Sequence, residues 1–152
     1  MATNPLFKSL TIDGTTMQLD DNLGQGFFQS ARTRISTANT DLQGATLTVT
    51  EPGSYLLMAN WGFNGASSTG SRQITCSISI KTNGESAWGG LAGTSAFHGN
   101  INNYSRLQTT GIYVFTSAQV PAQVAVFGRA SITTATGVND YNSIAYVKLI
   151  RT

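Results

Sequence analysis

The run of residues 45–63, ATLTVTEPGSYLLMANWGF, joins two strand-like segments across a Pro52-Gly53 break. In the first segment Leu47 and Val49 alternate with threonines, which predicts a strand with one buried and one solvated face. The second segment, from Tyr55 onward, is apolar almost without interruption and predicts a strand buried on both faces. Pro-Gly supplies a turn between them. This combination is typical of an antiparallel β-sandwich.

Similar patterns along the chain predict about eight strands and no helix longer than a turn. The predicted strands are residues 27–36, 45–50, 54–63, 72–81, 85–91, 107–116, 122–134 and 141–151. Their spacing is typical of a sandwich or barrel rather than of alternating strands and helices. The Asn83-Gly84 pair favours a type I′ hairpin turn, in which both central residues have positive φ.

Alternation also predicts which side chains are buried. Residues 74–81 alternate apolar and polar without exception, so one face of this strand is expected to lie in the core: Ile74, Cys76, Ile78 and Ile80. Cys76 is then a small buried hydrophobic residue rather than a reactive thiol. Trp61, inside the strand 54–63, is also expected in the core.

Three segments are apolar on both faces: residues 111–115, 124–127 and 144–150. A sandwich needs one apolar face per strand for its own core, so the second face of these strands needs another cover. Oligomerisation is the simplest cover.

Residues 1–25 form an N-terminal arm that differs from the domain of residues 26–152. Its dispersed apolar residues include Leu6, Phe7, Leu10 and Ile12. So short a segment does not make a core of its own, and we expect it to lie on a partner surface. The alternative is an arm folded over its own domain.

Composition excludes several classes of function. Only 11% of the 152 residues are charged and the net charge is +2, which does not favour nucleic-acid binding. No segment has the apolar length of a membrane span, and residues 1–20 lack the pattern of a secretion signal. The single cysteine allows no intrachain disulfide.

Residue types for catalysis are sparse, and we expect no enzyme, cofactor or metal. His98 is the only histidine and has no nucleophile motif beside it. One Cys and one His cannot complete a zinc site. Side-chain oxygens of the kind that bind calcium occur in the cluster Asp20-Asp21-Asn22 and at Asp140. The spacing of these residues is not that of an EF-hand loop, so they are expected to lie in solvated turns rather than to bind calcium.

The Gly-, Asn- and Ser-rich segment 88–104 carries four ring-bearing residues: Trp88, Phe97, His98 and Tyr104. Aromatic rings among amides are typical of carbohydrate-binding surfaces, where they stack on sugar faces. The same residues also serve packing between subunits or in the core, which is the preferred interpretation.

Four motifs resemble C1q/TNF-like jelly-roll domains in the family's order. The first is the family's stretch "G-x-F-x-V-x-x-P-G-x-Y", here Gly44, Leu47, Val49, Pro52, Gly53 and Tyr55. The others are Phe27-Phe28 with residues 30–32, the hairpin segment 78–84, and the closing segment 143–149. The resemblance implies an all-β jelly-roll sandwich that assembles as a homotrimer. On this basis the trimer contact is assigned to the aromatic residues of the doubly apolar strands: Tyr113, Phe115, Phe127 and Tyr146.

The functional hypothesis is a virion component on the outer capsid surface of a bacteriophage. By analogy with phage proteins that carry this fold, we expect a trimeric decoration or cement protein that binds the major capsid protein, with Leu6, Phe7, Leu10 and Ile12 of the arm as attachment residues. The main alternative is the receptor- or carbohydrate-binding head of a phage fibre, which recognises a host glycan. A C1q-like ligand is a third interpretation and an enzyme the fourth.

Overall fold

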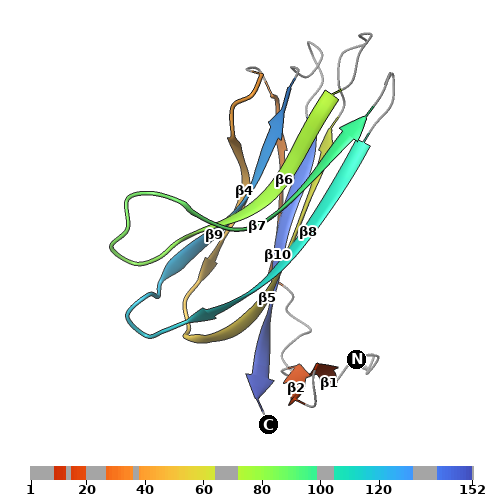
Figure 1. Ribbon diagram of the computed structural model, residues 1–152. Helices are drawn as coiled ribbons and strands as arrows, with labels where there is room; N and C mark the ends of the chain where they lie inside the picture. Colours follow the sequence, from red (N-terminus) through yellow and green to blue (C-terminus); the bar gives the residue numbers. More distant parts are fainter. Residues whose placement is uncertain are drawn as a thin grey trace, which may run out of the picture.

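The computed structural model of the protein describes residues 9–12, 15–19, 27–35, 38–63, 72–98, 105–131 and 140–151. Regular structure in these residues is entirely β-strand (Figure 1). The strands are β1 (Ser9–Ile12), β2 (Thr15–Leu19), β3 (Phe27–Thr33), β4 (Leu42–Val49), β5 (Gly53–Phe63), β6 (Arg72–Lys81), β7 (Gly89–His98), β8 (Ser105–Phe115), β9 (Ala122–Ala130) and β10 (Asp140–Arg151). The described part of the chain holds no helix that could cross a membrane.

The strands form two antiparallel sheets that pack into a β-sandwich. In the first sheet the order is β3-β10-β5-β8, and the hairpin of β1 and β2 joins it through β10. In the second sheet the order is β4-β9-β6-β7. One buried cluster draws side chains from both sheets. The predicted all-β antiparallel sandwich is therefore confirmed, and β3 to β10 correspond to the eight predicted strands.

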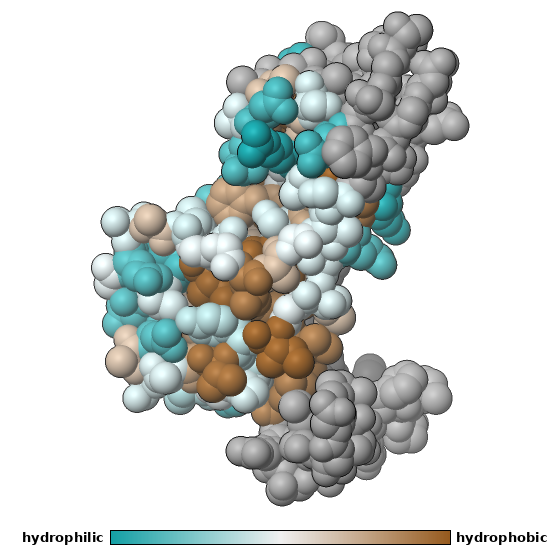
Figure 2. Space-filling model, viewed as in Figure 1, coloured by the Kyte–Doolittle hydropathy of each residue, from teal (hydrophilic) through white to brown (hydrophobic). Residues whose placement is uncertain are grey.

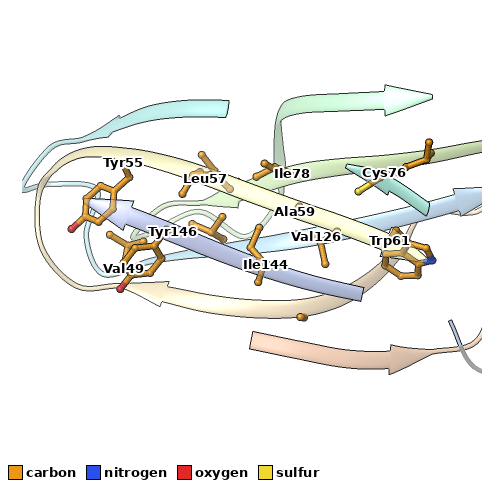
Figure 3. Packing of buried hydrophobic residues seen from close by; sticks show 14 of the residues in the cluster. Val49, Tyr55, Leu57, Ala59, Trp61, Cys76, Ile78, Val126, Ile144 and Tyr146 are labelled. Carbon is orange, nitrogen blue, oxygen red and sulfur yellow. The ribbon is translucent and has the colours of Figure 1, made fainter. Parts of the chain in front are cut away.

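The core is built from the inward rows of the strands. Side chains alternate between the two faces of a strand, so each strand gives the core every second residue. β6 buries Ile74, Cys76, Ile78 and Ile80, as predicted. Figure 3 shows Leu57 and Ile144 of the first sheet together with Ile78 and Val126 of the second in the same buried layer.

Trp61 on β5 is buried, as predicted, and it fits because two facing positions are glycine. A Cβ at Gly128 of β9 would lie 2.3 Å from the indole, and a Cβ at Gly44 of β4 would lie 2.8 Å from it. Protein interiors are close-packed, so these two glycines leave the volume that the largest core side chain occupies.

Two local predictions differ from the structure. The strand expected at residues 85–91 is Gly89–His98, because these small residues, which have low strand propensity, pair with β6 along their whole length. The Asn83-Gly84 turn is not type I′. Gly84 has φ +82°, but Asn83 does not have a positive φ, which a type I′ turn would require at both positions. With the hydrogen bond of 3.1 Å from the Glu85 N–H to the Thr82 carbonyl, this is the pattern of a type II turn.

The described part of the arm is a β-hairpin that pairs with strand β10 of the same chain. Ile12 pairs with Thr15, and the residues between them in sequence are Asp-Gly, a dipeptide typical of tight turns. β2 pairs with the last residues of β10, from Leu149 to Arg151. The arm therefore continues the first sheet beyond the end of β3.

Candidate functional site

The residues assigned to the trimer contact do not share one exposed surface. Phe115 and Tyr146 are buried in the core and Tyr113 is half-buried on the same inward face of β8. The Tyr55 ring lies 5.6 Å from the Phe115 ring and 5.2 Å from the Tyr146 ring, and the Tyr113 and Phe115 rings are 4.6 Å apart. These aromatic residues pack against one another between the sheets, which corrects their assignment to a subunit contact.

Phe127, the fourth residue of that assignment, lies on the outer face of the second sheet. Trp88, from the β6–β7 connection, packs edge-on against it with 5.4 Å between the ring centroids. The Lys81 ammonium group lies 5.1 Å from the centre of the Trp88 ring. The neighbouring Ala125 is fully buried. The second apolar face of β9 is thus covered by the protein's own chain, and the half-buried Trp88 is a packing residue.

Exposed apolar side chains gather instead on the outer face of the first sheet. Ile112 and Val114 on β8 are 45% and 60% exposed. Ile112 pairs with Leu56 on β5, and Leu56 pairs with Val147 on β10, so three apolar residues lie side by side across three strands. Met58 follows on the same face of β5 and is half-buried, like Leu56 and Val147. We call Leu56, Met58, Ile112, Val114 and Val147 the β5–β8–β10 surface.

The space-filling view supports an apolar surface in this part of the molecule. Figure 2 shows apolar side chains gathered in the lower half of the visible face, where β5 and β8 are drawn in Figure 1. Polar residues of β8 continue the same face at its other end, where Gln108 and Thr110 are exposed. Along β8 the apolar surface therefore ends at a polar row.

Sequence reasoning missed Ile112 and Val114, although a signal was present. Along β8 the residues at even positions begin as Arg106, Gln108 and Thr110, which marks this row as the solvent face. Ile112 and Val114 continue the same row. Continuing this alternation along the strand places Ile112 and Val114 outside the core and the aromatic residues Tyr113 and Phe115 inside it.

The arm lies next to the β5–β8–β10 surface in the first sheet. Leu19 of β2 pairs with Leu149 of β10, two residues after Val147. Leu10 and Ile12, two of the expected capsid contacts, lie on β1 opposite Met17 and Thr15. Leu6 and Phe7 lie outside the described residues. In the sheet order β1 is the terminal strand, with β2 as its neighbour.

The chemistry-bearing residues of the sequence are dispersed in the fold. Cys76 is fully buried, and burial raises the pKa of its thiol to about 12. His98 ends β7 opposite Arg72. Asp140 is buried at the start of β10, and residues 20–22 and Tyr104 lie outside the described part. Among the residues that the structure describes, no three His, Cys, Asp or Glu side chains gather where a metal ion could bind.

Comparison with known proteins gives no assignment. The sequence matches no protein-family model, and a search of curated proteins finds no significant match.

Proposed function

We propose that the protein is a structural component of a bacteriophage particle, a homotrimer that decorates the outer capsid surface and binds the major capsid protein. The observation that carries this proposal is the β5–β8–β10 surface. Val114 and Ile112 are 60% and 45% exposed in the protomer, beside the half-buried Leu56 and Val147. Contiguous exposed apolar side chains on a sheet face are typical of interaction sites, because leaving them in water is unfavourable.

A second copy is the partner that best fits this surface. Fully burying one Val or Ile side chain contributes about 1.5–3 kcal/mol, so several copies of this row around one axis supply a substantial driving force. The surface lies on three paired strands of the first sheet, and the polar row at Gln108 and Thr110 limits its extent along β8. Closed rotational symmetry is the common form of such self-association.

The strand order is compatible with the jelly-roll arrangement that the sequence motifs imply. β3, β10, β5 and β8 form one four-stranded layer, and β4, β9, β6 and β7 form the other. Two layers of four antiparallel strands are the architecture of a jelly roll, which occurs in viral capsid domains. The fold alone does not define a function, so the capsid role rests on this resemblance together with the apolar surface.

The arm is the proposed attachment element. β1 is the terminal strand of the first sheet, and a terminal strand offers backbone groups to which a further strand can be added. Leu10 and Ile12 lie on this strand. We infer that they contact the capsid protein together with Leu6 and Phe7.

The trimer is tested by light scattering on matched variants. Ile112→Asp places a charge within the β5–β8–β10 surface and is expected to yield monomers, because a buried unpaired charge is strongly unfavourable. Gln108→Asp makes the same type of change on the same face of β8, at its polar end, and should leave the trimer intact. A wild-type monomer at micromolar concentration would refute the trimer.

Attachment is tested separately with a deletion of residues 2–20. The truncated protein should remain a folded trimer that no longer co-sediments with capsids. Decoration at full occupancy by this variant would exclude the arm as the anchor. Absence of the intact protein from purified virus particles would exclude the capsid role, whatever the oligomeric state.

A further inference from the structure

A polar pocket of about 220 Å³ lies on the second sheet, at the end where β9 finishes. Its lining comes from three segments that are distant in sequence and give two residues each: Asn39, Asp41, Gln73, Thr75, Arg129 and Ser131. The lining carries one carboxylate, one guanidinium group, two amides and two hydroxyl groups. It contains neither an aromatic nor an aliphatic side chain. The pocket therefore differs from the apolar β5–β8–β10 surface in chemistry, and it lies on the other sheet.

The register of the second sheet brings the charged residues of the pocket together. Arg129 of β9 is the direct partner of Thr75 on β6. Leu42 of β4 pairs with Gly128, so Asp41, one residue earlier, is level with Arg129 on the other side of β9. The row across the sheet therefore runs from the Asp41 carboxylate through the Arg129 guanidinium group to the Thr75 hydroxyl group.

Hydrogen bonds hold the frame of the pocket in place. The Gln73 N–H donates to Ser131 Oγ at 3.0 Å, and the Ser131 N–H donates to the Gln73 carbonyl at 2.9 Å. The Asn39 N–H donates to the Ala130 carbonyl at 2.7 Å. Asn39 has φ +58°, a left-handed conformation that asparagine tolerates better than most residues. The Thr75 and Ser95 hydroxyl oxygens are 2.8 Å apart and extend the polar row to β7.

The two charges of the pocket remain available to a ligand. Both Asp41 and Arg129 are exposed. The ion pair found within the described ranges joins Lys148 to Glu51, and Asp41 and Arg129 are not paired with each other. Opposite charges that are close but unpaired offer an acceptor and a set of donors to the same small molecule.

This lining selects a neutral ligand with many hydroxyl groups. One carboxylate beside one guanidinium group leaves no net charge, so the pocket favours neither an anion nor a cation. Each sugar hydroxyl donates and accepts a hydrogen bond, which matches a wall of mixed donors and acceptors. The volume is below the range of about 300–1,000 Å³ that is typical of drug-sized ligands, which limits the occupant to about one ring.

We propose that this pocket binds one neutral pyranose unit of a glycan. Asp41 accepts hydrogen bonds from two adjacent hydroxyl groups of the sugar, and Arg129 donates to a neighbouring hydroxyl or to the ring oxygen. The Ser131 hydroxyl, whose oxygen accepts from Gln73, donates its proton to the ligand. The proposal does not depend on the capsid role, and the pocket stays open in a trimer formed through the first sheet.

The test is an NMR titration of the full-length protein, in which backbone amide shifts are followed while methyl glycosides of glucose, galactose, mannose and N-acetylglucosamine are added. At least one of these sugars should cause saturable shifts centred on Gln73, Thr75 and Arg129, with a dissociation constant of about 1 mM or below. Asp41→Ala and Arg129→Ala should each weaken binding by at least about tenfold. Gln123→Ala changes an exposed polar residue at the other end of β9 and should bind like the wild type.

Each other outcome overturns the proposal. No saturable shift with any neutral sugar, or shifts centred away from these residues, shows that the pocket is not a sugar site. Tighter binding of glucuronic acid or sialic acid than of the neutral sugars, with Asp41→Ala improving it, shows an anion site instead. Equal binding by the wild type and by a correctly folded Asp41→Ala variant also contradicts the assignment. Amide spectra of both variants verify their fold.

Discussion

The side-chain Oδ1 of Asn142 on β10 accepts a hydrogen bond of 2.7 Å from the backbone N–H of Ala45 on β4. The two strands belong to different sheets, so this bond joins the layers of the sandwich. Asn142 is fully buried, and its Nδ2 donates to Thr33 Oγ1 at 3.1 Å. A Cβ at Gly44 would lie 2.1 Å from the same Oδ1, so the glycine is needed for this approach.

Asn142→Leu should lower the free energy of unfolding by about 1–3 kcal/mol, because the buried Ala45 N–H loses its acceptor while the side-chain volume is nearly kept. Urea unfolding followed by fluorescence measures the change. Gln123→Leu alters an exposed amide and should change stability by less than about 0.5 kcal/mol. Equal stability of the two variants would show that the bond between the layers contributes little.

Gly128→Ala should destabilise the fold by about 1–3 kcal/mol, since its Cβ would meet the Trp61 indole at 2.3 Å and force the ring to move. A shift of the tryptophan emission should accompany the loss of thermal stability. Gly90→Ala is the matched control, because a Cβ there meets no atom within 4 Å. Unchanged stability of Gly128→Ala would mean that the core around Trp61 repacks freely.

Cys76 should make stability depend on pH in the alkaline range. Burial raises the pKa of its thiol from 9.0 to about 12, so the folded state keeps the proton after the unfolded state has lost it. The thiol's contribution to the free energy of unfolding is fully present below pH 9. As pH rises from 9 toward 12 this free energy falls by up to about 1.4 kcal/mol per pH unit. Urea unfolding at several pH values should therefore show a steeper alkaline decline for the wild type than for Cys76→Ala. Parallel pH curves would contradict a buried thiol.

Cys76→Ser should weaken the fold by about 1–3 kcal/mol through burial of a hydroxyl group, and it should leave partner binding unchanged. Thermal unfolding and capsid co-sedimentation measure the two effects separately. Loss of binding at unchanged thermal stability would indicate a functional thiol instead.

Trp88→Ala should expose Phe127 and cost about 1 kcal/mol, because it removes an edge-to-face aromatic contact and the contact with the Lys81 ammonium group. Trp88→Phe keeps a ring at this position and should retain most of the stability. Chemical denaturation of both variants gives the comparison. Equal stability of the Trp88→Ala and Trp88→Phe variants would show that an aromatic ring over Phe127 contributes little to the fold.

Several features of the fold were predictable because they depend on neighbours in sequence. The alternation of residues 74–81 identified the buried row of β6, and the largely apolar run after Tyr55 identified β5 as a strand. The prediction that β5 is buried on both faces was wrong, because Leu56 and Met58 on its outer face are only half-buried. The β7 strand was less predictable because its glycines and small residues carry weak local preference. Its pairing with β6, which holds the strand in place, appears only in the folded chain.

For the candidate sites, too, some features follow from the local sequence and others from the tertiary structure. The sequence by itself determined that β8, β9 and β10 carry apolar residues on both faces, because side chains alternate with a period of two residues along any strand. Only the tertiary structure decided what covers each face: Phe115 and Tyr146 pack in the core, Trp88 covers Phe127, and Ile112 and Val114 stay exposed. The polar pocket also depends on pairing, since register brings Asp41 beside Arg129. Strand order and register arise from contacts between residues far apart in sequence, which local patterns do not encode.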